Sequence, residues 1–154
     1  MPDSARAATQ ADVLSALHVL EYPYKRSVGP VIGRFLTGLM EGRIEGIKSA
    51  SGKVMVPPAE YDPATGAPLS EFVEVADAGV VTTWAWVAEP REHNPVQEPF
   101  AWALIRLDGA DTALLHAVRA PGGGMRTGMR VKARWRPERT GLITDIECFE
   151  PEDA

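Results

Sequence analysis

The second half of the chain has a sequence period of two, which restricts it to β-strands. From residue 72 onward, apolar or β-branched side chains alternate with polar ones in short runs. The runs cover 72–76, 79–89, 100–107, 112–118, 129–136 and 142–149. Because only a short glycine-containing break separates the first two runs, we treat 72–89 as one bent strand. Five strands with a bent first one predict a small Greek-key barrel, although the strand count alone equally permits a sandwich fragment or an SH3-like barrel.

A helical period precedes the strands. Between residues 28 and 40 the apolar residues recur every three or four positions, at Val28, Val31, Ile32, Phe35, Leu36, Leu39 and Met40. This spacing predicts an amphipathic helix, and Gly42 supplies its stop signal. Glycines at 29, 33 and 38 each weaken the helix by up to about 1 kcal/mol relative to alanine. We therefore expect the helix to depend on packing against another surface, such as a partner chain.

Residues 46–66 have the spacing of two zinc-ribbon turns but lack the metal ligands. Each turn of a zinc ribbon reads C-x-x-C-G, because two thiolates grip one tetrahedral ion and the glycine closes the turn. Gly52 and Gly66 occupy the glycine positions, whereas the four ligand positions hold Lys48, Ser51, Asp62 and Thr65. We therefore expect no zinc site. Asp and Thr side chains bond nearby backbone amides, so these turns can form without metal.

A simpler interpretation of the same segment is a hairpin from Arg43 to Val56 followed by a proline-rich loop, and composition alone favours it. The single cysteine, Cys148, permits no internal disulfide, which is typical of a reducing compartment. No apolar run approaches the ~20 residues that span a bilayer, and the N-terminus shows no signal pattern. We expect a cytoplasmic protein without a membrane partner.

No arrangement of residues indicates catalysis. His18, His93 and His116 are scattered and form no metal-ligand spacing. Asp108 and Asp111 fall in a hairpin turn, where aspartate is common. The glycines at 122–124 lack the lysine and the following helix of a phosphate-binding loop, so we expect a barrel loop there.

The order of helix, ribbon and barrel resembles one known family. The motifs that carry the resemblance are the helix 28–42, Gly52, Val56-Pro57-Pro58, the turn 61–66, Thr-Trp-Ala-Trp at 83–86 and Gly-Met-Arg-Val at 128–131. Over residues 22–151 the chain resembles the OB-fold, acyl-CoA-associated proteins known as domain of unknown function thirty-five, which include zinc-ribbon/OB-fold proteins. It departs from them in the missing zinc cysteines and in Ala59, where an arginine often follows the proline pair.

The resemblance implies a mainly β fold with four segments: a flexible arm (1–21), an amphipathic helix (22–42), a metal-free ribbon-like segment (43–69) and an OB-fold domain (70–151). It also implies a non-catalytic accessory subunit, in a hetero-oligomer with a thiolase-like acyl-CoA enzyme of the lipid-transfer or aldolase type. The expected setting is lipid or steroid metabolism, with acyl-CoA as a shared ligand and no cofactor of its own.

The resemblance also suggests roles for individual residues. Partner contacts are expected at Ile32, Phe35, Leu36, Leu39, Pro57, Pro58 and Tyr61. Arg126 and Arg130 are expected to contact the phosphates of coenzyme A. These two arginines belong to the basic stretch 119–139, which holds seven basic residues and one acidic one and so carries +6 in a chain of net charge −5.

Other interpretations of the basic strand, the predicted strand 129–136 within this stretch, stay open. Its charges are equally consistent with solvation, or with pairing to acidic residues across the sheet. The rival function is binding of single-stranded nucleic acid, in which Trp84, Trp86 and Trp102 would stack on bases. In alternating strands, however, tryptophans more often belong to a core or an interface.

Overall fold

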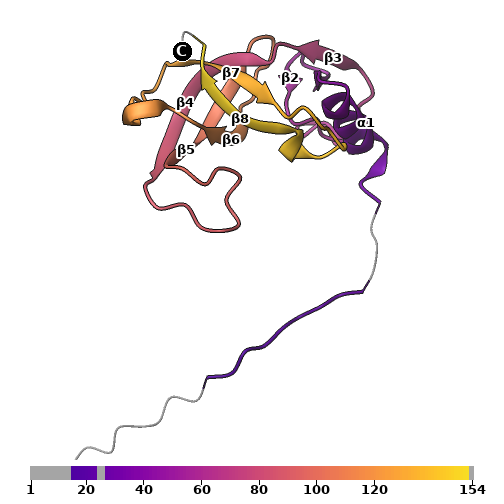
Figure 1. The fold of residues 1–154 in the computed structure, drawn as a ribbon. Helices are drawn as coiled ribbons and strands as arrows, with labels where there is room; N and C mark the ends of the chain where they lie inside the picture. The colour runs from indigo at the N-terminus through magenta and orange to yellow at the C-terminus, as the bar shows by residue number, and fades with distance from the viewer. Residues whose placement is uncertain (1–14, 24–26, 153–154) are drawn as a thin grey trace, which may run out of the picture.

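A closed five-stranded barrel forms the body of the molecule in this computed structural model, which describes residues 15–23 and 27–152 (Figure 1). The strands are β4 (Ala78–Val87), β5 (Phe100–Leu107), β6 (Leu114–Val118), β7 (Arg130–Trp135) and β8 (Ile146–Pro151). Their order around the barrel is β4-β5-β6-β8-β7, and β7 pairs back with β4. The pairs are antiparallel except β6 with β8. This is an OB-fold, so the predicted fold is confirmed.

The alternation along β5 shows how the pattern builds the barrel. Ala101, Ala103, Ile105 and Leu107 point inward and are at most 1% exposed, whereas the residues between them face outward. Gly79 on β4 faces Leu107 so closely that a Cβ atom at position 79 would lie 2.3 Å from the Arg106 carbonyl oxygen. Glycine is therefore required at this crossing of two strands.

The prediction of one bent strand over residues 72–89 is wrong in one respect, because this segment forms two separate strands. Residues Phe72–Val75 form β3, which pairs with β1 (Ile44–Lys48), and only β4 enters the barrel. The break is fixed by other elements: the Ala76 N–H donates to the Asp108 carbonyl oxygen at 3.0 Å, and Trp135 Nε1 donates to Asp77 Oδ2 at 3.2 Å. The last predicted strand also starts later, since the short 3₁₀ turn η2 (Ile143–Asp145) precedes β8.

The ribbon-like segment forms a three-stranded sheet in the order β2-β1-β3. The predicted hairpin is present, because β1 pairs with β2 (Val54–Met55) through Ile47 with Met55 and Lys48 with Val54. The β2 edge is bonded to the turn between β5 and β6, where Asp111 Oδ2 accepts the Val54 N–H at 2.8 Å. The ribbon is therefore attached to the barrel by its backbone.

Helix α1 (Gly29–Met40) packs on this chain's own core. Phe35 and Leu39 are 3% and 0% exposed and lie in one hydrophobic cluster with barrel residues. The buried Glu45 on β1 fixes the helix further, since Arg34 Nη2 donates to Glu45 Oε1 at 2.7 Å. The surface that the glycine-rich helix needs is therefore supplied by the chain itself rather than by a partner.

The end of α1 is held from two directions. Gly42 adopts φ +79°, and the Arg43 N–H donates to the Gly38 carbonyl oxygen at 2.9 Å, which confirms the predicted stop. From the connection between β7 and β8, Arg139 Nε donates to the Met40 carbonyl oxygen at 2.9 Å. A cation from the barrel thus caps the helix C-terminus.

The predicted N-terminal arm lies partly outside the described residues, which omit 1–14 and 24–26. Residues 15–23 have no regular secondary structure, are exposed and run away from the body of the molecule (Figure 1). Within the described residues, no helix has the length and apolar character to cross a membrane.

Candidate functional site

Two glycine-closed turns face each other in the ribbon and are joined by one carboxylate. Gly52 and Gly66 adopt φ +84° and +71°, as the knuckle-like spacing requires. Asp62 Oδ1 accepts the N–H groups of Ala64 at 2.8 Å and Thr65 at 3.2 Å, within its own turn. Asp62 Oδ2 accepts the Ala50 N–H at 3.0 Å, from the other turn. A buried side chain therefore links the two turns where a zinc ribbon would use an ion.

The Asp62 carboxylate is held in its ionised form. Its side chain is buried, with the residue 3% exposed. Backbone hydrogen bonds from Ala64 and Ala50 lower the pKa of Asp62 and outweigh the opposing effect of burial. The sequence predicted that Asp62 would close its own turn, but the bond to Ala50 depends on how the two turns meet.

Tyr61 stands beside this link and is presented to solvent. It forms an isolated bridge with Pro68, and the Leu69 N–H donates to the Glu60 carbonyl oxygen at 2.9 Å, so its backbone is fixed. The Tyr61 side chain is nevertheless 60% exposed. Pro57 is also exposed, whereas Pro58 is buried. An exposed aromatic side chain on a fixed backbone is a typical anchor for a partner.

The four residues of α1 that were predicted to contact a partner differ in burial and fall into two pairs. Phe35 and Leu39 are buried in this chain's core, so the expectation that they contact a partner is corrected. Ile32 and Leu36 are half-buried and share one face with Val28 and Met40, which are 53% and 44% exposed. We call these four residues the helix stripe.

Two other segments with exposed apolar residues approach α1. At its start, the Glu60 carboxylate lies beside Gly29, and the next residue, Tyr61, is 60% exposed. Towards its end, Gly141 lies against the Leu36 carbonyl oxygen, and the next residue, Leu142, is 54% exposed. We call Tyr61, the helix stripe and Leu142 together the helix face, because the segments that carry Tyr61 and Leu142 approach α1 at Gly29 and Leu36.

The basic strand β7 is largely neutralised by acidic residues. Arg130 Nη1 and Nη2 donate to the two carboxylate oxygens of Asp108 at 2.7 and 2.8 Å, and its Nε donates to Glu152 at 2.8 Å. These hydrogen bonds raise the pKa of Arg130. Arg134 pairs in the same way with Glu147 and Glu150 at 3.0 and 3.1 Å. The charges of β7 are thus explained by pairing with acidic residues. This weakens the case for nucleic-acid binding, which depended on the same basic side chains.

Arg126 and Arg130 do come together, at one cavity of about 390 Å³ beside the loop 120–129. Arg126 is exposed, and its side chain has no hydrogen-bond or ion-pair partner among residues 15–23 and 27–152. Three of the five N–H donors of Arg130 are bonded to the carboxylates of Asp108 and Glu152, whose charges oppose an anion there. Of the two arginines, Arg126 is therefore the better placed to bind an anion.

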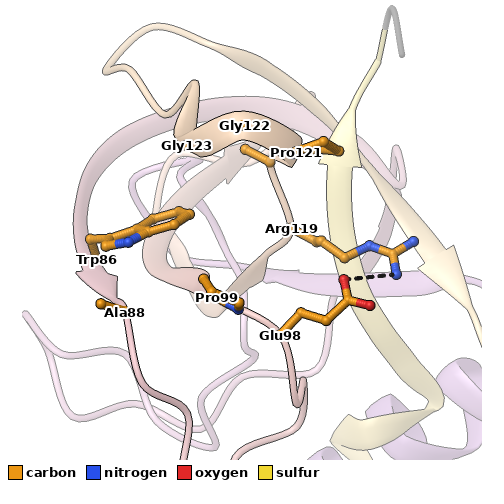
Figure 2. Close-up of a pocket in the computed structure, with 9 residues that line it drawn as sticks. Trp86, Ala88, Glu98, Pro99, Arg119, Pro121, Gly122 and Gly123 are labelled. Atoms are coloured by element: carbon orange, nitrogen blue, oxygen red, sulfur yellow. Dashed lines mark ion pairs between the residues drawn. The ribbon is translucent and has the colours of Figure 1, made fainter.

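A second cavity, of about 510 Å³, lies on the other side of the same loop. Figure 2 shows the Trp86 indole on one wall, Pro99 below it, and Pro121, Gly122 and Gly123 in the loop above. The far end is closed by Arg119, whose guanidinium pairs with Glu98 at 4.0 Å and also with Glu150. Sequence alternation did not predict this cavity, because it does not show where the loop 119–123 lies relative to Trp86.

Two of the three histidines come together, since His93 and His116 both line one cavity of about 320 Å³. His93 is exposed in the β4–β5 loop, His116 is buried on β6, and His18 lies in the exposed segment 15–23. Burial raises the pKa of the Cys148 thiol to about 11, so it is protonated at neutral pH. Across the described part of the chain, no three His, Cys, Asp or Glu residues are placed to hold a metal ion.

Comparisons with known proteins support the barrel. The family model for the C-terminal OB-fold domain of ChsH2 matches residues 72–136. A crystal structure of a DUF35-family protein of unknown function from Sulfolobus solfataricus is similar, with TM-score 0.55 and 26% identity, over 68% of this chain and 78% of that chain. A structure described as an Ltp2-ChsH2(DUF35) aldolase has TM-score 0.59 and 21% identity, over 82% of this chain and 98% of that chain. No curated protein matches this sequence.

Proposed function

The chain is an OB-fold protein of the DUF35 type, and on that premise we propose that it is a non-catalytic accessory subunit of a thiolase-like acyl-CoA enzyme of the aldolase type. The observation that carries the proposal is the helix face, which combines Tyr61, 60% exposed on a hydrogen-bonded backbone, with the partly exposed apolar stripe of α1. Apolar patches of this kind mark interaction sites in soluble proteins. The similar chain from an Ltp2-ChsH2(DUF35) aldolase supports the choice of partner.

The role of the ribbon in this proposal is to position Tyr61. A zinc ribbon would hold its two turns by metal, whereas here Asp62 holds them by three backbone hydrogen bonds. The turns need no conformational change to present Tyr61 and Pro57, so little entropy is lost on binding. The reacting groups would belong to the partner enzyme, in lipid or steroid metabolism.

Purification of the tagged protein from its own host is expected to recover a thiolase-like enzyme in near-stoichiometric amount. With that enzyme in hand, Tyr61→Ser is expected to raise the dissociation constant by about 10- to 100-fold, because an anchor residue typically contributes 1–3 kcal/mol. Titration calorimetry measures the change. Lys132→Ala, at an exposed position on β7 that is not part of the helix face, is the control and leaves the affinity unchanged. Recovery of the protein alone, or of nucleic acid, would contradict the proposal.

We further propose that the chain helps to bind the coenzyme A thioester through Arg126. The guanidinium of Arg126 has free donors at a 390 Å³ cavity, whereas Arg130 is already paired with two carboxylates. Arg126→Gln is expected to weaken coenzyme A binding by the complex about 5- to 20-fold, as loss of one charge-assisted hydrogen bond does. Lys132→Gln removes an equal charge outside the cavity and serves as the control. Equal affinities of the Arg126→Gln and Lys132→Gln complexes would remove this assignment.

A further inference from the structure

Residues 15–23 expose a cluster of apolar side chains to solvent. Leu17 is 93% exposed, Val19 61% and Leu20 68%, and the segment has no regular secondary structure. Segments that remain in solvent are usually poor in large apolar residues, because such residues favour burial. The segment 15–23 therefore has the composition of one that docks on an apolar surface.

The barrel has an apolar surface of this kind at the groove of about 320 Å³ that residues of β5, β6, η2 and the β4–β5 loop line. Its walls are mainly apolar and include Leu115 and Ile143, which are 58% and 40% exposed. His93 and Thr144 add polar groups to it. Leu104, which pairs with Leu115 across the two strands, is 37% exposed. These apolar side chains stand in solvent unless another segment covers them.

The segment 15–23 is close enough along the chain to reach this groove. Gly141 lies against the Leu36 carbonyl oxygen, and Leu36 is seven positions after Gly29, the first residue of α1. Because a helix rises about 1.5 Å per residue and an extended chain about 3.3 Å, the path from Gly29 past Leu36 to Ile143 is about 25 Å. Leu20 lies nine positions before Gly29, and an extended chain of that length spans about 30 Å. The apolar residues of the segment can therefore reach Ile143.

We propose that segment 15–23 docks into this groove of its own chain, where its apolar side chains cover Leu115 and Ile143. A short flexible link keeps two parts of one chain at an effective concentration in the millimolar range, so the groove meets its own segment more often than that of a second copy. The gain from burying the apolar side chains is close to the cost of ordering the backbone that carries them. The docked segment therefore exchanges with the extended one that Figure 1 shows.

A nitroxide spin label on the full chain tests the docking. Ser15→Cys carries the label at an exposed position, whereas the native Cys148 is buried and does not react. We expect the NMR signals of Leu115 and Ile143 to lose intensity at least about twofold, because the docked and extended states are both populated. The signal of Lys132 on β7, which pairs with neither β5 nor β6, is the reference and keeps its intensity. The loss is expected to be unchanged on about tenfold dilution, since docking within one chain does not depend on concentration.

Variants of the labelled chain separate docking from chance contact. Leu17→Ser combined with Leu20→Ser is expected to restore the signals of Leu115 and Ile143, whereas Glu21→Ser, at a polar position of the same segment, leaves the loss unchanged. Signals of Leu115 and Ile143 as strong as the Lys132 reference, or a loss that persists in the double variant, overturn the proposal. A loss that weakens on dilution would place the segment on a second copy and overturns it as well. These measurements use the free protein, so their outcome is independent of the accessory role that Tyr61→Ser tests.

Discussion

Gly79→Ala is expected to destabilise the barrel by about 3 kcal/mol or more and to lower Tm by roughly 6–12 °C. The new Cβ would lie 2.3 Å from the Arg106 carbonyl oxygen and 2.7 Å from Leu107 Cα. Both atoms belong to the backbone of β5, so no side chain can rotate away, and the β4–β5 pairing must open. Thermal unfolding followed by circular dichroism measures the loss.

The matched control for Gly79→Ala is Gly33→Ala, which adds the same methyl group in α1. There the new Cβ would lie 3.8 Å from Val28 Cγ2, an ordinary contact. Since alanine favours helix more than glycine, this variant is expected to gain up to about 1 kcal/mol. Opposite signs for the two variants would confirm that the crossing at residue 79 is the constraint, and a Gly79→Ala protein as stable as the wild type would refute it.

Asp62→Asn is expected to separate the two ribbon turns and to lower Tm by several degrees. An asparagine amide offers only one acceptor, so either the Ala50 N–H or the pair from Ala64 and Thr65 loses its partner. Hydrogen exchange is expected to accelerate at Ala50 and Ala64, with little change in the barrel. Glu60→Gln alters the charge of the adjacent residue and is the control. Unchanged exchange at Ala50 would show that the link does not hold the turns.

The Asp62 effect is also expected to depend on pH. The folded pKa of Asp62 lies below its ordinary value, chiefly because the Ala64 and Ala50 amides bond to the carboxylate. A carboxyl whose pKa falls on folding stabilises the protein fully above its unfolded pKa, near 3.9, and this contribution disappears as the pH drops through the folded pKa. The Tm difference between wild type and Asp62→Asn is therefore expected to be largest at neutral pH and to shrink below about pH 4.

The strand pattern predicted the barrel because alternation depends only on which residues face a core. It did not predict that residues 72–75 leave the barrel, since the same alternation suits pairing with β1. Helical spacing likewise identified the apolar residues of α1 but not their partners, and Phe35 and Leu39 proved to lie in the chain's own core.

The geometry of the candidate sites could not be predicted from the sequence, because it depends on strand register and tertiary contacts. The spacing of residues along the chain does not show either of these. Arg130 is neutralised because Asp108 and Glu152, 22 residues away on each side, lie next to it in the sheet. The Trp86 cavity depends on the position of the loop after β6, whose residues Pro121, Gly122 and Gly123 line it together with the indole. The bonds of Asp62 within its own turn could be predicted from local turn chemistry. Its bond to Ala50 could not, because it depends on how the two turns meet in the fold.

The bond from Arg139 to the Met40 carbonyl oxygen joins residues 99 positions apart. At a synthesis rate of roughly 5–20 residues per second, the ribosome makes residue 139 some 5–20 s after residue 40. Until then the helix C-terminus has only the local closure at Gly42 and Arg43. The helix face therefore reaches its final form only after residues 139–142 have been made, so assembly through it cannot precede their synthesis.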